Sequence, residues 1–199
     1  MKKKLRMLLI SCLMRVSTRI SLNIPNFLTI LRVIIAPMVY FAFQYQTPWP
    51  LIGLVLFIIG SFTDWLDGLL ARKYSEVSGF GQFADPVADK LLSGFGMITI
   101  AIMGYSYILP IIGIIIRDIF ITSFRFWALY KGKKILPSKL AKAKTGIELL
   151  GIVGILGYIV LGGQAEGFWI GSTVFIIVFI LAWVTGIDYF WKNRSILSG

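Results

Sequence analysis

The sequence DWLDGLLAR at residues 64–72, followed after eight residues by GQFADPVAD at residues 81–89, places four aspartates between two apolar stretches. Charged side chains beside segments long enough to cross a bilayer are energetically costly and usually serve a function. Four carboxylates held close together repel one another unless a cation lies between them. Hard divalent cations such as Mg²⁺ take oxygen ligands of this kind, often together with substrate phosphates.

The spacing of these aspartates assigns them to two helices. Asp64 and Asp67 are three residues apart, and Asp85 and Asp89 are four apart, so each pair shares one face of a helix. Small residues at positions 68, 71 and 81 let two helices, or a helix and a ligand, approach closely. The pattern therefore predicts that both faces meet around one or two metal ions. The alternative is a set of helix-capping or surface carboxylates at the membrane rim.

The composition is typical of an integral membrane protein. Of 199 residues, 57% are hydrophobic, and the mean hydropathy is +0.83. A helix needs about 20 mostly apolar residues to span a bilayer. Six such stretches occur, roughly at residues 26–45, 50–71, 82–104, 107–129, 145–163 and 168–190. The predicted fold class is an all-α bundle of six transmembrane helices, with no second domain and no internal repeat.

The basic residues predict the topology. Lysines and arginines occur before the first span, after the second, in the loop Lys131–Lys144 after the fourth, and after the last, whereas the other three loops have none. By the positive-inside rule, both termini and the aspartate motif are cytoplasmic. The net charge of +11 fits this topology and attraction to anionic lipid headgroups. It does not indicate nucleic-acid binding, which requires a soluble basic face.

Residues 1–22 form a basic segment ahead of the membrane domain at residues 23–199. Its start resembles a signal peptide, but arginines interrupt the apolar core that a signal needs. Apolar residues recur at helical spacing, so we expect an amphipathic helix on the cytoplasmic leaflet. With one Cys and no His, the chain has no internal disulfide, no His-based zinc site and no His-based triad.

Polar residues also interrupt the first predicted span. Asn26, Thr29 and Arg32 follow one another at intervals of three residues. We interpret them as a ligand-facing strip, although Asn26 is also a good helix cap.

A second basic group lies in and after the fourth predicted span. Arg117 and Arg125 are eight residues apart and therefore point to nearly the same side of a helix. Arginine forks match phosphate oxygens, so the pair predicts a phosphate clamp, which Lys142 and Lys144 would complete. The alternative is a structural ion pair between Arg117 and Asp118 or a motif aspartate. Lys90, next to the last motif aspartate, would reach the same space or neutralise the acidic cluster.

The aspartate motif resembles the signature of the CDP-alcohol phosphotransferase family, D-x-x-D-G-x-x-A-R-x8-G-x-x-x-D-x-x-x-D. Every fixed position is filled, by Asp64, Asp67, Gly68, Ala71, Arg72, Gly81, Asp85 and Asp89. The family moves a phosphatidyl group from a CDP-linked lipid to a small alcohol and releases CMP. The resemblance implies a homodimeric enzyme of the cell (inner) membrane.

From Asn23 onward the chain resembles the phosphatidylglycerophosphate synthase branch of that family. The basic groups around Arg117 and Lys142, together with NIPN at residues 23–26, carry this resemblance. It implies CDP-diacylglycerol and sn-glycerol 3-phosphate as substrates. Other acceptors remain open, namely phosphatidylglycerol, inositol phosphate or serine. A remoter alternative is an ion or proton transporter, although carrier sites tend to lie at the midplane between repeats.

The resemblance also implies roles for single residues. It assigns the CDP-lipid pocket to Asn26, Thr29, Gly68, Arg72 and Ser78. We expect two ions, Mg²⁺ or Mn²⁺, one held by Asp64, Asp67 and Asp85 and the other by Asp64, Asp85 and Asp89. Asp89 is the expected general base on the acceptor hydroxyl. The acceptor's phosphate is assigned to Arg117, Arg125, Lys142 and Lys144.

Overall fold

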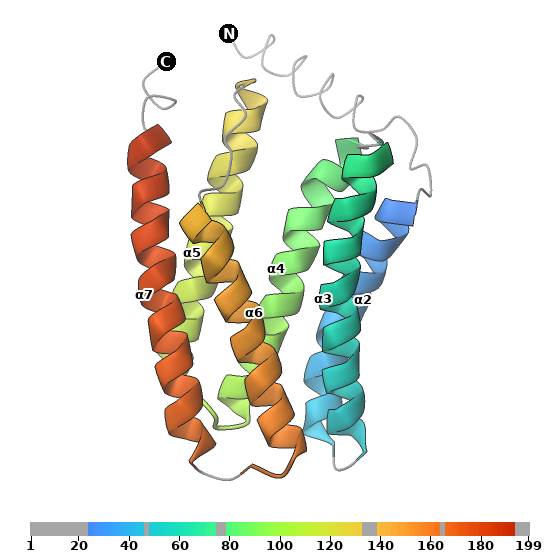
Figure 1. Cartoon of the computed structure of the whole chain (residues 1–199), viewed down its shortest axis with the longest axis vertical. Coiled ribbons are helices and arrows are strands. Elements are labelled where there is room, and N and C mark those ends of the chain that lie inside the picture. The colour runs from blue at the N-terminus through green and yellow to red at the C-terminus, as the bar shows by residue number, and fades with distance from the viewer. Residues whose placement is uncertain (1–23, 46–47, 75–78, 133–138, 164–165, 194–199) are drawn as a thin grey trace, which may run out of the picture.

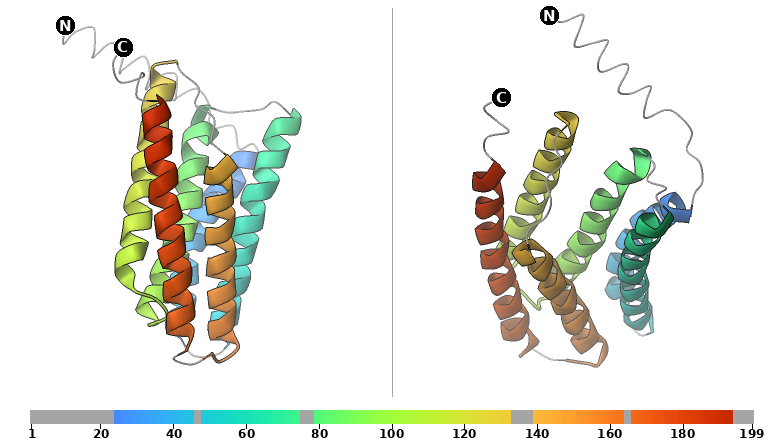
Figure 2. Two further views of the ribbon diagram at one scale, coloured as in Figure 1. Left: turned by 60° about the vertical axis from the view of Figure 1, so that its left-hand side comes forward. Right: turned by 45° about the horizontal axis from the view of Figure 1, so that its top comes forward.

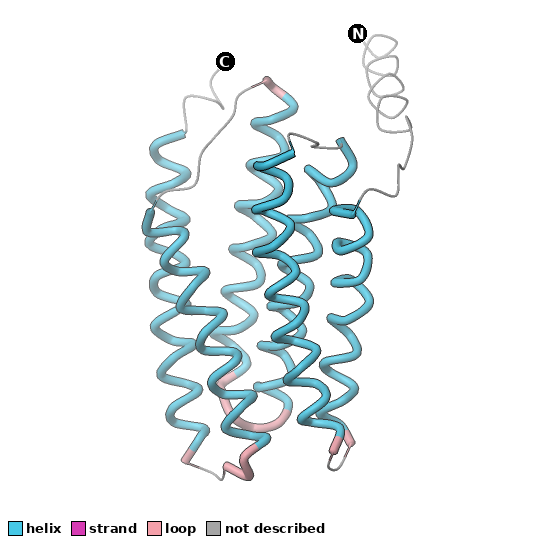
Figure 3. Tube along the Cα trace, turned by 45° about the vertical axis from the view of Figure 1, so that its right-hand side comes forward, coloured by secondary structure: helices cyan, strands magenta, loops and turns pink. Residues whose placement is uncertain are grey.

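The computed structural model describes residues 24–45, 48–74, 79–132, 139–163 and 166–193. For residues 24–26, 64–74, 79–83 and 139 it describes the helical backbone alone. The described chain is all-helical, as predicted (Figure 3). Six helices follow one another, α2 (Ile24–Gln44), α3 (Trp49–Tyr74), α4 (Gly79–Ile102), α5 (Ile108–Tyr130), α6 (Lys139–Val160) and α7 (Gly167–Asn193). The N-terminal segment at residues 1–22 lies outside the described residues.

The helices run alternately up and down in two groups of three (Figure 1). Helix α2 packs on α3 and α4, and α7 packs on α5 and α6, while α4 contacts α5 and α3 contacts α6 between the groups. The start of α2 and the end of α7 therefore lie at one end of the bundle, together with the ends of α3 and α5 and the starts of α4 and α6. At that end the two groups diverge (Figure 2).

The core consists of aliphatic and aromatic side chains spaced three or four residues apart on each helix. On α5, for example, Ile111 and Ile114 are buried three residues apart, and Phe124 and Ala128 four residues apart, which is the period of one helix face. The centre contains Phe57, Met97, Ile100, Ile152, Leu156 and Phe175, each at most 1% exposed. This core holds the helices in place below the diverging end.

The outer surface is also apolar. Large hydrophobic side chains are exposed on every helix, for example Phe41, Ile58, Leu109, Leu150 and Trp169. Soluble proteins rarely expose apolar patches of more than a few hundred Å². Among the described side chains, three helices are long and apolar enough to cross a membrane, at residues 27–44, 140–160 and 167–193, and α3 has a shorter apolar run at 49–63. The chain is therefore an integral membrane protein, and three of the six predicted spans meet that criterion.

The boundary of one helix differs from the prediction. The sequence places a loop at Lys131–Lys144, whereas α6 already begins at Lys139. Leucine, alanine and lysine, which fill residues 139–144, are strong helix formers, so the chain becomes helical before the apolar run starts. Lys142 and Lys144 consequently lie within one turn of a helix, which fixes their directions, instead of in a loop.

The end opposite the divergence is closed by close packing. The Tyr105 hydroxyl donates a hydrogen bond to the Gly163 carbonyl oxygen at 2.5 Å, and the Tyr107 N–H donates to Ser172 Oγ at 3.3 Å. A Cβ atom at Gly171 would overlap the backbone oxygen of Tyr105, so only glycine allows α7 to approach the α4–α5 turn. These contacts hold α7 against the α4–α5 turn at this end of the bundle.

Candidate active site

A cavity of about 500 Å³ lies among α4, α5, α6 and α7 at the diverging end. Its lining residues come from residues 85–90 of α4, 117–125 of α5 and 141–149 of α6, together with Tyr189 of α7. The polar and charged lining residues are Asp85, Asp89, Lys90, Arg117, Asp118, Thr122, Arg125, Lys142, Thr145 and Tyr189. The cavity therefore has carboxylates on α4 facing a wall that is rich in cations.

The carboxylate side of the cavity is formed by α4. Asp85 and Asp89 lie one turn apart on it, as predicted, and both are partly exposed. The buried Thr29 hydroxyl of α2 donates a hydrogen bond to Asp85 Oδ1. Asp89 Oδ2 lies 3.4 Å from Lys90 Nζ. Helix α2 thus fixes one carboxylate, while a neighbouring cation partly neutralises the other.

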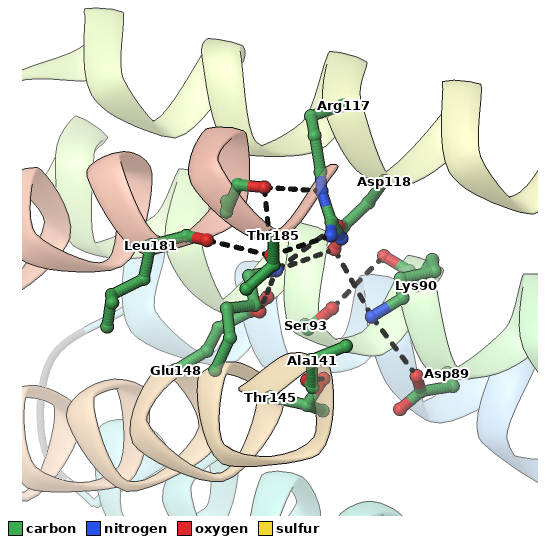
Figure 4. Close-up of polar contacts among 12 residues, drawn as sticks. Asp89, Lys90, Ser93, Arg117, Asp118, Ala141, Thr145, Glu148, Leu181 and Thr185 are labelled. Carbon is green, nitrogen blue, oxygen red and sulfur yellow. Dashed lines mark hydrogen bonds and ion pairs between the residues drawn. The ribbon is translucent and has the colours of Figure 1, made fainter. Parts of the chain in front are cut away.

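A buried ion network lies behind the cationic wall (Figure 4). Asp118 is 4% exposed and forms three ion pairs. They are with Arg117 Nη1 at 2.8 Å, Lys144 Nζ at 3.0 Å and Lys90 Nζ at 3.2 Å. Lys144 also contacts Glu148 at 2.5 Å, one turn further along α6. Removing charges from water is unfavourable unless they are well paired, and here one carboxylate is paired with cations from three helices. The network connects α4, α5 and α6 just beneath the cavity.

Arg117 is further tied to α7. Its Nε donates to the Ala182 carbonyl oxygen at 2.8 Å, and Nη2 donates to Thr185 Oγ1 at 3.0 Å. A guanidinium has five N–H donors, and the contacts with the described residues use three of them. The alternative weighed for this residue, an ion pair with Asp118, is therefore present, and Arg117 nevertheless lines the cavity. Arg117 can hold the fold together and still offer two N–H groups to an anion.

The structure gathers five of the predicted site residues around the cavity, namely Asp85, Asp89, Arg117, Arg125 and Lys142. Lys144 is not among the lining residues, because it is 1% exposed and directed into the ion network. Thr29 does not line the cavity, but its hydroxyl donates a hydrogen bond to Asp85, which does. The remaining predicted residues, Asn26, Asp64, Asp67, Gly68, Arg72 and Ser78, have side chains outside the described part of the chain. The proposed roles of all these residues stay predictions.

Asp85 and Asp89 fit a site for a hard cation, because their oxygens are partly exposed on successive turns at the cavity. Among the described side chains no group of three or more Asp, Glu, His or Cys residues could hold a metal ion. Asp64 and Asp67, which would complete the predicted set, lie in the last turns of α3, where only the backbone is described. The four-aspartate metal site therefore stays a prediction.

Sequence reasoning missed two polar residues of this region. Glu148 could have been found, because it follows Lys144 by four residues, the spacing of a helical ion pair. Tyr189 lines the cavity from α7, and its only signal was a polar group one turn after Thr185 in an otherwise apolar helix. The proximity of Asp118 to Lys144 carried no signal at all, since 26 residues separate them.

Comparison with known proteins gives one consistent result. Residues 22–188 match the family described as CDP-alcohol phosphatidyltransferase. A CDP-diacylglycerol–glycerol-3-phosphate 3-phosphatidyltransferase from Rickettsia felis is 34% identical over 178 residues, covering 86% of this chain and 96% of that protein. Proteins of the same name from Yersinia pestis (strain Pestoides F) and Sodalis glossinidius are 36% identical over 140 residues, or 68% of this chain and 77% of each of theirs.

Proposed function

Since this chain belongs to the CDP-alcohol phosphatidyltransferase family, we propose that it transfers the phosphatidyl group of CDP-diacylglycerol to sn-glycerol 3-phosphate and releases CMP. The name of its relatives supports this pair of substrates. The product is phosphatidylglycerophosphate.

One observation carries the choice of acceptor. The cavity combines two carboxylates on α4 with Arg117, Arg125 and Lys142 on the facing side. An acceptor without a phosphate group would not need these three cations, because it would carry no phosphate for them to bind. Arginine binds phosphate oxygens in a fork, and this favours glycerol 3-phosphate over an uncharged alcohol or serine.

In the proposed reaction the basic wall binds and orients the acceptor. Arg125 and Lys142, which make no hydrogen bond or ion pair within the described part of the chain, are available to the phosphate together with the two remaining N–H groups of Arg117. Holding the acceptor in this way turns a collision into a positioned attack, which lowers the entropic part of the barrier.

Asp89 is the proposed general base. It accepts the proton of the acceptor hydroxyl, whose oxygen attacks the lipid-side phosphorus, while the bond from that phosphorus to the CMP oxygen breaks. Lys90 Nζ lies 3.4 Å from Asp89 Oδ2, so a cation stands beside the proposed base. Thr29 fixes Asp85 one turn away, so that the two carboxylates keep their relative positions.

The metal requirement is part of the proposal. Bound at Asp64, Asp67, Asp85 and Asp89, one or two Mg²⁺ or Mn²⁺ ions would neutralise charge on the pyrophosphate and stabilise the CMP leaving group. The other ligand roles, those of Asn26, Gly68, Arg72 and Ser78 in the CDP-lipid pocket, rest on the resemblance to the family.

We also propose that all six helices span the membrane, with both termini and the cavity on the cytoplasmic side. Along the sequence, Lys and Arg occur before α2, at the end of α3, after α5 and at the end of α7, which supports this orientation. Cysteines introduced singly at Lys131 and Gly104, after removal of Cys12, test it. An impermeant thiol reagent added outside intact cells should label the cysteine at 104 and spare the one at 131. A homodimer is proposed from the family resemblance alone.

A direct assay tests the reaction. The purified protein is mixed with CDP-diacylglycerol, Mg²⁺ or Mn²⁺, and in turn glycerol 3-phosphate, phosphatidylglycerol, inositol phosphate or serine, and CMP release is measured. We expect release with glycerol 3-phosphate and background release with the others. A different acceptor giving the fastest release would refute the proposed substrate, while absence of release with every acceptor would refute the proposed reaction.

Chelation tests the metal requirement separately. EDTA should reduce CMP release to background, and excess Mg²⁺ or Mn²⁺ should restore it. Full activity in metal-free buffer would contradict the proposed metal site and leave the choice of acceptor untouched.

A further inference from the structure

The hydroxyl of Tyr189 is a buried polar group without a hydrogen-bond partner among the described residues. The side chain is 6% exposed, yet it belongs to the wall of the cavity. Its ring packs edge-on against Phe124 of α5, with the ring centroids 6.1 Å apart. The ring of this lining residue is therefore held in place by packing, while its buried hydroxyl has no hydrogen-bond partner among the described residues.

A buried hydroxyl without a partner is unfavourable, because it has lost its bonds to water and gained none in the protein. Phenylalanine would fill the same space without this cost, and the chain uses 15 phenylalanines elsewhere. Because Tyr189 is a lining residue of the cavity, a ligand bound there is the nearest source of the missing partner.

The neighbours of Tyr189 indicate what that ligand carries. Thr185, one turn earlier on α7, accepts a hydrogen bond from Arg117 Nη2 (Figure 4). Arg125 lines the same cavity and immediately follows Phe124, the ring that packs on Tyr189. An anion bound by the two arginines would bring oxygen atoms to this side of the cavity, and a phenol can donate a hydrogen bond to such an oxygen.

We infer that Tyr189 is a positioning residue whose hydroxyl donates a hydrogen bond to the phosphate of the acceptor, next to Arg117 and Arg125. This inference rests on the proposed function and extends it, because it brings α7 into an acceptor site otherwise formed by α5 and α6. The acceptor and the pyrophosphate of the CDP-lipid both carry phosphate oxygens. We assign the hydrogen bond of Tyr189 to the phosphate of the acceptor.

Tyr189→Phe tests this inference, since it removes the hydroxyl and little else. We expect KM for glycerol 3-phosphate to rise roughly 10- to 150-fold, the effect of losing one hydrogen bond to a charged group. KM for CDP-diacylglycerol should not change. The melting temperature should stay the same or rise, because the variant no longer buries an unsatisfied hydroxyl.

Tyr105→Phe is the matched control at the closed end. It removes a hydroxyl that does have a partner, the Gly163 carbonyl oxygen. We expect a lower melting temperature with both KM values unchanged, the opposite pattern to Tyr189→Phe.

A readout without turnover separates this inference from the proposed reaction. Inorganic phosphate should raise the melting temperature of the wild-type protein more than that of Tyr189→Phe. If the wild type transfers to no acceptor but phosphate still stabilises it more than Tyr189→Phe, the contact of Tyr189 with a phosphate stands and the proposed reaction fails. An unchanged acceptor KM in Tyr189→Phe, or a rise confined to CDP-diacylglycerol, would overturn the inference.

Discussion

At one end of the bundle the helices are in close contact, whereas at the other end they diverge (Figure 2) beside a charged cavity of about 500 Å³. The closed end relies on glycines and tyrosines, with Gly171 against the Tyr105 backbone and the Tyr105 hydroxyl bonded to Gly163. The open end relies on ion pairs, with Asp118 bound to cations from three helices. Close packing thus sets the helix geometry at one end, and charge holds a polar site at the other.

The largest expected effect is at the acidic side of the open end. Asp89→Asn should reduce CMP release roughly 10²- to 10⁴-fold, the usual contribution of a general base. Binding of CDP-diacylglycerol should be retained, because the amide keeps the size of the side chain. Initial rates of CMP release, together with equilibrium binding of the lipid, measure both quantities. Wild-type turnover in this variant would show that Asp89 is not the base.

The next effect is on stability, at the centre of the ion network. Asp118→Asn should lower the free energy of unfolding by about 3–5 kcal/mol, since it leaves three cations without their common carboxylate. Thermal melting of the detergent-solubilised protein measures this.

Asp188→Asn is the control for that variant. Its pair with Lys192 is exposed, so its loss should cost about 0–1 kcal/mol. Equal losses for the two variants would mean that the network contributes no more than a surface ion pair.

Substitution of the two arginines separates binding of the acceptor from stabilisation of the fold. Arg125→Ala should raise KM for glycerol 3-phosphate roughly 10- to 150-fold with little change in melting temperature. Arg117→Ala should raise KM and also lower the melting temperature, because its side chain joins α5 to α7. Michaelis kinetics with each substrate and thermal melting separate these effects. If folded Arg117→Ala keeps its acceptor KM, Arg117 serves the fold alone.

The smallest expected effect is at the closed end. Gly171→Ala should destabilise the protein by about 1–3 kcal/mol, because the added methyl group forces α7 away from the α4–α5 turn. Gly154→Ala, where a Cβ meets nothing within 4 Å, should be neutral or stabilising. Thermal melting compares the pair, and equal melting temperatures would contradict the role assigned to close packing.

Much of the fold was open to prediction from the sequence. Apolar runs of about 20 residues predicted six helices, and each is observed within a few residues of its expected position, except that α6 starts six residues earlier. Short-range periodicity also placed Asp85 and Asp89 on one helix face, since that depends only on the geometry of a helix. These are local properties, and local properties can be read from the order of residues.

The candidate site was predictable in part. Arg117, Arg125 and Lys142, which the sequence analysis grouped by their chemistry, line one cavity with the α4 carboxylates, and their roles stay predictions. Lys144 differs from the expectation in its position, because it turns inward to Asp118 and Glu148. Lys142 and Lys144 are two residues apart, so they point about 200° apart on a helix and cannot both face the cavity.

The sequence by itself determined the family, the helices, their alternating directions and the segments that carry charge. The tertiary structure alone decided which charges line the cavity and which are buried beneath it. Contacts such as Asp118 with Lys144, or Thr29 with Asp85, join residues 26 and 56 positions apart. They depend on how three-dimensional packing sets the distance and rotation between helices, and no local pattern of residues records that.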